Sequence, residues 1–377
     1  MEGFRELTEQ LEIEGYDREL YQRIRENWDH VAKPLDGMGK FEDLLARIGA
    51  IQGRETPELQ RTRLIVSCAD NGIVEEGVSQ SGQEVTAICA ASIANGRSSV
   101  AIMAREAGID VLTVDVGINS AEAPSNVRNL KVRRGTRNFL REPAMTGEET
   151  QKAICAGMGL VRESKAQGYS ILCMGEMGIG NTSTSSAITA ALLGIPAEMV
   201  TGRGAGLDDK GLLHKREVIR KALEKYGWQT ASGEQKSDGK VQDPDLAGEA
   251  AFQVLANVGG LDVACMTGIC LGGAKYRVPI VLDGFISFAA ALVACRMEER
   301  VKEFLIPSHS GKEPAMKLME DALGVSPVIY ANMALGEGTG AVLMMQLLKT
   351  ANAVYEQSTS FEKAGIRQYE RFSNNEK

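Results

Sequence analysis

Short apolar runs alternate with alanine-rich segments of helical periodicity from residue 64 onward, and this alternation restricts the possible folds more than any other feature of the chain. The strand-like runs occupy residues 64–68, 111–116, 170–174, 199–200 and 278–282. The segments with helical spacing occupy residues 85–95, 98–107, 149–167, 183–193, 212–226 and 288–297. Such alternation predicts an α/β fold, with a mostly parallel sheet covered by helices on both faces. In such sheets ligands bind beyond the carboxyl ends of the strands, so the loops there are the candidates for a site.

The two ends of the chain differ from this central part. Residues from about 4 to 60 are charged and carry apolar residues at helical spacing, interrupted by Pro34 and two nearby glycines. A helix that is apolar on one side is expected from residue 340 to about 357. Residues 227–245 are polar and aperiodic, which predicts a solvent loop between two helices, and residues 371–377 are expected to be frayed.

The composition excludes several classes of protein. The 377 residues carry a net charge of −8, so no basic field attracts nucleic acid or an anionic membrane surface. An alternating basic strip at 131–141 is interpreted as a solvated face. Residues 1–7 lack the apolar core of a signal peptide, and the most apolar stretch, 278–297, contains Asp283 and helix breakers. We therefore expect a cytoplasmic protein without a membrane span.

Cysteine usage indicates a reducing compartment. The seven cysteines include no Cys-x-x-Cys pair, and only three histidines are present. Most of the cysteines lie in apolar runs, so buried free thiols are the simplest interpretation. A structural zinc site is not expected, because the residues that would complete it are missing from the neighbourhood of the cysteines.

Two glycine-rich loops have the composition of ligand-binding loops. The run GEMGIGNT at 175–182 follows a strand and opens a helix, so its backbone can approach an anion or ribose; a plain tight turn is the alternative. The run TGRGAG at 201–206 has glycine at alternate positions, which weakens a strand and favours a ligand loop. Lys215 beyond it would supply a point charge for phosphate, or be merely solvated.

Two further loops place aspartates at predicted strand ends. The run ADNG at 69–72 contains Asp70, which suits a ligand but equally suits a turn. The run LDGFIS at 282–287 contains Asp283, which is suited to hydroxyl binding and also to capping a helix.

The last two loops contain the titratable residues His309 and Glu337. The run SHSGKE at 308–313 invites a serine hydrolase interpretation, but no Gly-x-Ser-x-Gly elbow supplies the nucleophile. In the run LGEGTG at 335–340, Glu337 lies between glycines at the start of an apolar helix. Poor solvation would raise its pKa and suit a general base, whereas an acid favoured by the helix dipole is the alternative.

Taken together and in this order, these loops resemble those of the nicotinate-nucleotide–dimethylbenzimidazole phosphoribosyltransferases, the family that makes the lower nucleotide loop of cobalamin. The resemblance extends from about residue 5 to about residue 360. It is carried jointly by GEMGIGNT, VGGLD at 258–262, LDGFIS and LGEGTG. It implies a Rossmann-like large domain at 61–340, a small helical domain built from 1–60 and 341–377, and a homodimer.

The resemblance also implies a reaction. Nicotinate would leave the ribose C1′ of nicotinate mononucleotide, and a nitrogen of 5,6-dimethylbenzimidazole would attack from the opposite face to give α-ribazole 5′-phosphate. The pyridinium leaving group is already cationic, so neither a metal nor a cofactor is required. The attacking benzimidazole loses an N–H proton, which a carboxylate can accept.

Residue roles follow from the same match. Glu337 would be the general base, and Glu176 would lie near the ribose and stabilise oxocarbenium-like charge. Ser81 and Leu335 would border the aromatic base, and Asp283 would line the nucleotide side. The remaining expected contacts to substrate, chiefly to its phosphate and ribose, are Gly178, Asn181, Thr182, Gly202, Gly204, Gly206, Lys215 and Ser308.

The chain departs from the family pattern at three places. The family usually reads Ala-Asp-His-Gly, Ala-Tyr-Pro and Ser-Ala-Glu where this chain has Asn71, Gln80-Ser81-Gly82 and Gly311-Lys312-Glu313. These changes fall on the expected walls around the aromatic base and the phosphate. Two alternatives stay open. One is the same chemistry on a purine, another benzimidazole or a phenolic compound, including as one subunit of a heteromer; the other is a non-catalytic nucleotide-binding partner subunit.

Overall fold

The computed structural model describes residues 2–8, 11–228 and 244–371, and its centre is a parallel sheet of six strands in the order β3-β2-β1-β4-β5-β6. All five strand pairings are parallel. The strands are β1 Thr62–Ala69, β2 Asp110–Gly117, β3 Arg128–Asn129, β4 Ile171–Met177, β5 Ile280–Val281 and β6 Leu305–Ile306. This is the strand order of the Rossmann fold, which confirms the predicted α/β architecture.

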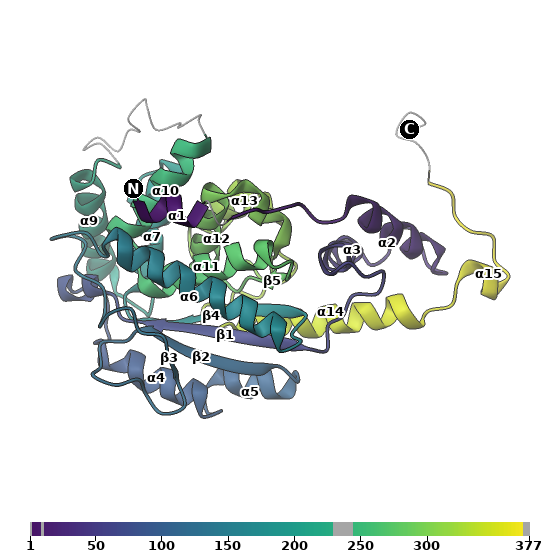
Figure 1. Ribbon diagram of the computed structural model, residues 1–377, viewed down its shortest axis with the longest axis horizontal. Helices are drawn as coiled ribbons and strands as arrows, with labels where there is room; N and C mark the ends of the chain where they lie inside the picture. Colours follow the sequence, from purple (N-terminus) through teal and green to yellow (C-terminus); the bar gives the residue numbers. More distant parts are fainter. Residues whose placement is uncertain (1, 9–10, 229–243, 372–377) are drawn as a thin grey trace.

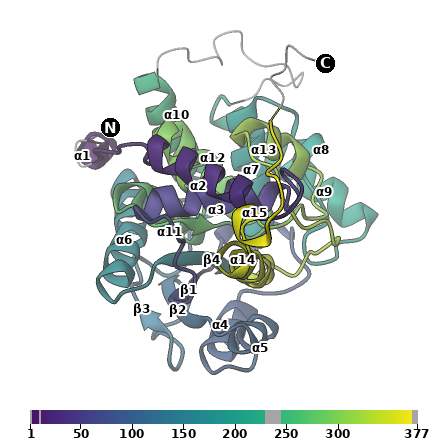
Figure 2. The same ribbon diagram turned by 90° about the vertical axis from the view of Figure 1, so that its right-hand side faces the viewer.

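Helices cover both faces of the sheet (Figures 1 and 2). Because successive side chains of a strand point to opposite faces, Leu64 and Val66 of β1 belong to one core cluster while Ile65 belongs to the other. One face carries α6 Gly147–Ala166, α7 Asn181–Leu193, α10 Pro244–Val258, α11 Leu261–Lys275 and α12 Phe285–Met297. The other carries α4 Glu84–Ala94, α5 Ser99–Glu106 and the first part of α14 Thr339–Gln357.

A separate group of helices lies at the far end of α14 (Figure 1). It consists of α2 Arg18–His30, α3 Lys40–Gln52 and the last turns of α14, followed by α15 Phe361–Ala364. Trp28 of α2 is fully buried there, with its ring 4.9 Å from that of Tyr355 on α14. Both halves of the chain therefore contribute to this group.

The first helix, α1 Glu2–Thr8, packs elsewhere. Its Phe4 ring lies 5.9 Å from Phe252 of α10, and its Phe4 and Leu7 belong to the core on the α6 side of the sheet. The contacts of α1 are therefore with the large α/β unit. At the other end of the chain, Arg371 pairs with Asp29 of α2 and with Asp36, while residues 372–377, expected to be frayed, lie outside the described residues.

Two sequence expectations need correction. Residues 199–200, expected as a strand, end the short helix α8 Ala197–Val200, because Pro196 at its N-cap starts a helical turn. Of the expected loop 227–245, residues 229–243 lie outside the described residues, and α10 begins at Pro244. The other elements are η1 Gly72–Glu76, α9 Asp209–Lys225, η2 Glu299–Phe304 and α13 Met316–Leu323.

One stretch of the described chain, Glu84–Glu106, is long and apolar enough to cross a membrane by length and composition. In the structure it is divided into α4 and α5. The division falls after Asn95, the C-cap of α4, where Gly96 has a φ of 73°. The stretch is therefore not one continuous helix, and it carries little weight as evidence for a span.

Candidate active site

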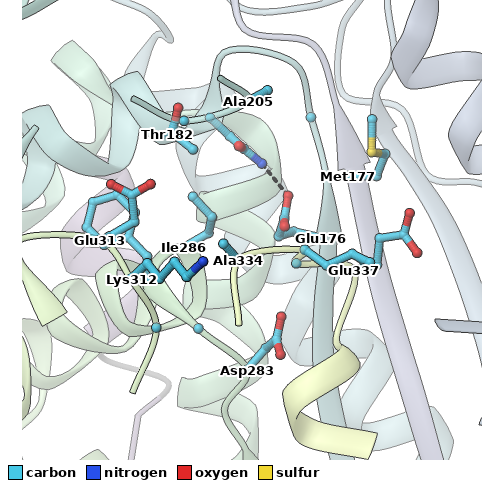
Figure 3. Close-up of a pocket in the computed structure, with 18 of the residues that line it drawn as sticks. Glu176, Met177, Thr182, Ala205, Asp283, Ile286, Lys312, Glu313, Ala334 and Glu337 are labelled. Carbon is cyan, nitrogen blue, oxygen red and sulfur yellow. Dashed lines mark hydrogen bonds between the residues drawn. The ribbon is translucent and has the colours of Figure 1, made fainter. Parts of the chain in front are cut away.

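A pocket opens beyond the carboxyl ends of β1, β4 and β5, where this strand order places ligands (Figure 3). It encloses about 240 Å³ and is lined by the loops that follow these strands, together with residues 203–205, 207, 309, 311–313 and 333–337. Eight of the residues selected from the sequence lie on its wall: Glu176, Gly178, Asn181, Thr182, Gly204, Asp283, Leu335 and Glu337. Loops separated by more than 100 residues in the sequence thus meet in one cavity.

The five other selected residues contact this wall from behind or beside it. Lys215 is buried with its Nζ 2.8 Å from Thr182 Oγ1, and Ser308 donates to the carbonyl of Asp283. A Cβ on Gly202 would collide with Glu313, and Ser81 follows the wall residue Gln80. Gly206 accepts a hydrogen bond from the Gln80 side chain at 2.6 Å.

Glu337 lies on a loop with an unusual backbone. Its φ is 60°, and its neighbours Gly336 and Gly338 have φ values of 81° and 100°, so three consecutive residues are left-handed. The carboxylate is directed away from Glu176 and Asp283 (Figure 3) and toward the start of α5. There it accepts the N–H of Val100 at 3.4 Å and a hydrogen bond from Ser98. Partial burial raises the pKa of Glu337, while the Val100 and Ser98 donors oppose this rise.

Glu176, the next-to-last residue of β4, is part of a chain of polar side chains. The amide of Asn181 donates to Glu176, as the dashed line in Figure 3 marks, and to Asp262 at 3.2 Å. Burial of its carboxyl raises the pKa of Glu176 to about 8, and burial also raises the pKa of Asp262 to about 6. Glu176 is therefore mostly protonated at neutral pH.

The opposite side of the pocket contains a buried cation. Lys215 is 1% exposed, and burial lowers its pKa to about 8 even though Glu313 opposes this shift. A Cβ on Gly204 would lie 2.7 Å from Thr182 Oγ1 and 3.2 Å from Lys215 Nζ, so the loop backbone passes close to this lysine. Thr182 and Glu313 lie on one side of the cavity and Glu337 on the other (Figure 3).

Several wall residues were not anticipated from the sequence. They add apolar side chains and two cations to the wall, and they include Val78, Met177, Arg203, Phe285, Ile286, Lys312 and Met333. Most of them lie within or next to the selected loops, and that proximity is the signal that could have identified them.

The serine hydrolase interpretation of His309 is not supported. Ser308 Oγ lies 3.1 Å from His309 Nδ1, but Ser308 is fully buried and its hydroxyl donates to the Asp283 carbonyl. A nucleophile has to reach the substrate, and this hydroxyl does not face the pocket. Burial also lowers the pKa of His309. Across the described part of the chain, no group of three or more His, Cys, Asp or Glu side chains has an arrangement that could hold a metal ion.

The departures from the family pattern lie in two settings. Asn71 is fully buried and contacts Asp262 and the carbonyl of Ile179, so it supports the polar chain behind the pocket. Gln80 and Gly311 line the pocket itself. Of these departures, the second and third are therefore the ones in a position to alter its shape.

The sheet order and the polar pocket beyond its carboxyl edge define a Rossmann-like α/β protein with a site for a small molecule. Residues 13–366 match the model of a family described as phosphoribosyltransferase. The chain belongs to the family of the nicotinate-nucleotide–dimethylbenzimidazole phosphoribosyltransferases.

Individual relatives agree with this assignment. The enzyme of this name from Ruminiclostridium cellulolyticum is 37% identical over 357 residues, which cover 95% of this chain and 96% of the relative. The one from Geobacter sp. is 38% identical, with coverage of 94% and 97%. Among solved structures, CobT from Thermus thermophilus superimposes with a TM-score of 0.83 at 36% identity and covers 93% of this chain and 100% of that one.

Proposed function

We propose that this protein transfers the 5-phosphoribosyl group of nicotinate mononucleotide to 5,6-dimethylbenzimidazole, releasing nicotinate and α-ribazole 5′-phosphate. The names of its relatives support the substrates. The observation that carries the proposal is the arrangement of charge in one pocket. A carboxylate of raised pKa, Glu337, lies on one side, and the buried Lys215 lies behind Thr182 on the other.

Glu337 is the general base. The acceptor nitrogen that attacks C1′ acquires positive charge, and loss of the proton on the other ring nitrogen completes the transfer. A carboxylate whose pKa is raised by burial accepts this proton more readily at neutral pH than a solvated glutamate would. The donor's pyridinium ring leaves as nicotinate, whose ring nitrogen becomes neutral by taking the electron pair of the bond to C1′, so the step requires no metal and no cofactor.

Glu176 and Asn181 face the ribose. Glu176 is mostly uncharged at neutral pH, and a bound pyridinium nucleotide would favour its ionised form by bringing positive charge close to it. The ionised carboxylate then stabilises the oxocarbenium-like charge at C1′. Asn181 holds this carboxyl in place through its amide.

The phosphate binds on the side of Thr182 and Lys215. The N-terminus of α7, with N-cap Gly180, turns the positive end of its helix dipole to this side, and the Gly178 and Gly204 backbones allow close approach. Gly202, Gly206 and Ser308 act behind this wall. Ser81 and Leu335 border the acceptor base, with Leu335 54% exposed.

The domain boundaries, the oligomeric state and the location of the protein are proposed from the family pattern. The large domain comprises residues 61–340, and the small helical domain comprises residues 1–60 and 341–377. Contacts among α2, α3 and α14 support this division, whereas α1 packs against the large domain. The protein is a cytoplasmic homodimer and acts without nucleic acid or membrane partners.

A panel of acceptors tests the reaction. Purified protein with nicotinate mononucleotide should convert 5,6-dimethylbenzimidazole in preference to other benzimidazoles, purines and phenols, with products identified by mass. If only a purine or a phenol is converted, that compound is the acceptor and 5,6-dimethylbenzimidazole is not. If nicotinate mononucleotide binds but no acceptor is converted, the protein is better explained as a non-catalytic partner subunit.

The role of Glu337 is tested separately. Glu337→Gln keeps the shape of the side chain and removes the base, so kcat should fall by about 10²–10⁴-fold. Glu106→Gln, which removes an exposed carboxylate from the last residue of α5, is the matched control. Unchanged kcat in Glu337→Gln would exclude it as the base.

A further inference from the structure

The helix that follows the base, α14, begins without a capping side chain of its own. Its N-cap residue is Gly338, which makes no side-chain hydrogen bond. The cap comes from Asp283, 55 residues earlier in the chain, at the end of β5. Asp283 Oδ2 accepts the N–H of Gly338 at 3.1 Å, and Oδ1 accepts that of Gly340 at 2.7 Å. A carboxylate at a helix N-terminus satisfies free N–H groups and interacts favourably with the helix dipole.

The loop held in this way has a conformation that does not persist without support. The left-handed conformation is unfavourable for a glutamate, because its Cβ approaches the following carbonyl oxygen, and Glu337 has a φ of 60°. The loop is also packed tightly from below, because a Cβ on Gly175 of β4 would lie 2.2 Å from the Glu337 carbonyl oxygen. Contacts with the start of α14 and with Gly175 of β4 therefore fix the backbone position of Glu337.

Asp283 itself is firmly placed. It is 3% exposed, and its carbonyl accepts the Ser308 hydroxyl at 2.9 Å. Further backbone donors, Ala341 and Gly284, also face the carboxyl. Both of its oxygens are thus engaged by main-chain N–H groups. A ribose hydroxyl would therefore have to share these oxygens with the N–H groups of the loop.

We infer that Asp283 is a positioning residue, which holds the loop carrying the general base by capping α14, and not a contact to the nucleotide. This changes the role expected for Asp283 from the sequence, and it rests on the proposed function because it requires Glu337 to be the base. Asp283 acts on the reaction only through the placement of Glu337.

The test is a double-mutant cycle on the full-length protein. Asp283→Asn keeps the size of the side chain but turns an amide NH₂ toward the loop N–H groups. It should lower kcat by about tenfold or more and leave KM for nicotinate mononucleotide within about twofold of wild type. In the Glu337→Gln background it should cause no further loss, because residues that act as a unit are not additive.

A matched control separates this effect from general destabilisation. Asp115 is also a buried aspartate at a strand end, and its Oδ1 accepts the N–H groups of Gly117 and Ile118 on another loop. Asp115→Asn should lower Tm but leave kcat unchanged. If Asp283→Asn does not fold, Ser308→Ala removes the hydroxyl that holds Asp283 and should lower kcat by a smaller factor at unchanged KM.

The outcomes distinguish this inference from the proposed function. If wild type is active and Glu337→Gln is impaired, the base assignment stands. Three results would then overturn the positioning role alone. In Asp283→Asn these are a raised KM with unchanged kcat, or a loss of kcat that multiplies with the loss in Glu337→Gln. The third is unaltered kinetics in Asp283→Asn, or in Ser308→Ala if only that variant folds. An inactive wild type, or an unimpaired Glu337→Gln, would overturn the proposed function instead.

Discussion

Replacement of Glu176 by glutamine should change how the stability of the protein depends on pH. Burial raises the pKa of this carboxyl from 4.5 to about 8, so the folded protein keeps a proton there at pH values where the unfolded chain has lost it. The contribution of this carboxyl to stability is therefore fully present below about pH 4.5 and decreases as pH rises toward the folded pKa. The glutamine variant carries no such proton and lacks this dependence.

The magnitude follows from one bound proton. Between about pH 5.5 and 7.5 the linkage is about 1.4 kcal/mol of unfolding free energy per pH unit. For 377 residues, with an unfolding entropy of about 2.1 cal/mol/K per residue, this corresponds to about 2 °C of Tm per pH unit. Relative to wild type, Glu176→Gln should gain about 3 °C as pH rises across these two units, because the folded carboxyl has begun to lose its proton at pH 7.5.

The assay is thermal unfolding followed by circular dichroism at half-unit steps of pH. Only the trend of the difference in Tm matters, because glutamine also alters the hydrogen bonds that Asn181 and the Glu337 N–H make to this side chain. Glu198→Gln, at an exposed position of α8, is the control and should follow wild type. A difference between Glu176→Gln and wild type that stays constant from pH 5.5 to 7.5 would refute the reasoning.

Three further predictions concern the phosphate side, the base loop and the core. Because the pKa of Lys215 is lowered to about 8, affinity for nicotinate mononucleotide in calorimetric titrations should weaken above about pH 8, and Lys215→Met should remove this dependence. Gly175→Ala would displace the Glu337 carbonyl and should reduce kcat at least tenfold in steady-state assays. In the control Gly159→Ala, on α6, the new Cβ meets nothing within 4 Å, so this variant should keep wild-type activity and be slightly more stable than wild type. Leu348→Ala, at a fully buried position of α14, should cost about 2–5 kcal/mol in urea unfolding.

Much of the fold could be predicted from periodicity. The run at 64–68 alternates between the two core clusters and became the centre of the sheet. Strands β3 and β6 have two residues each, too few to show any period, and residues 199–200 were misassigned for the same reason. Helix α11 was not identified because almost all of its residues are buried, so it has no polar face to reveal a helical repeat.

The candidate site was predictable in its parts and not in its connections. Glycine-flanked Glu337 and the 175–182 loop stand out in the sequence. The bridge from Asn181 to Asp262 joins residues 81 positions apart, and no local pattern encodes such a pair. The burial of Lys215 likewise depends on how α9 packs against α7, which spacing along one helix cannot reveal.

The floor of the pocket also determines where its selectivity can be redesigned. Gly175, Gly178 and Gly336 present bare backbone to the cavity, and a Cβ at each would lie within 2.5 Å of an atom of a neighbouring loop or side chain. A side chain at any of these three glycines would displace the neighbouring loops or side chains and would not simply change the contacts to an acceptor. The adaptable surface is formed by exposed side chains of the wall, such as Gln80 and Leu335, so a library aimed at new acceptor molecules should be restricted to them.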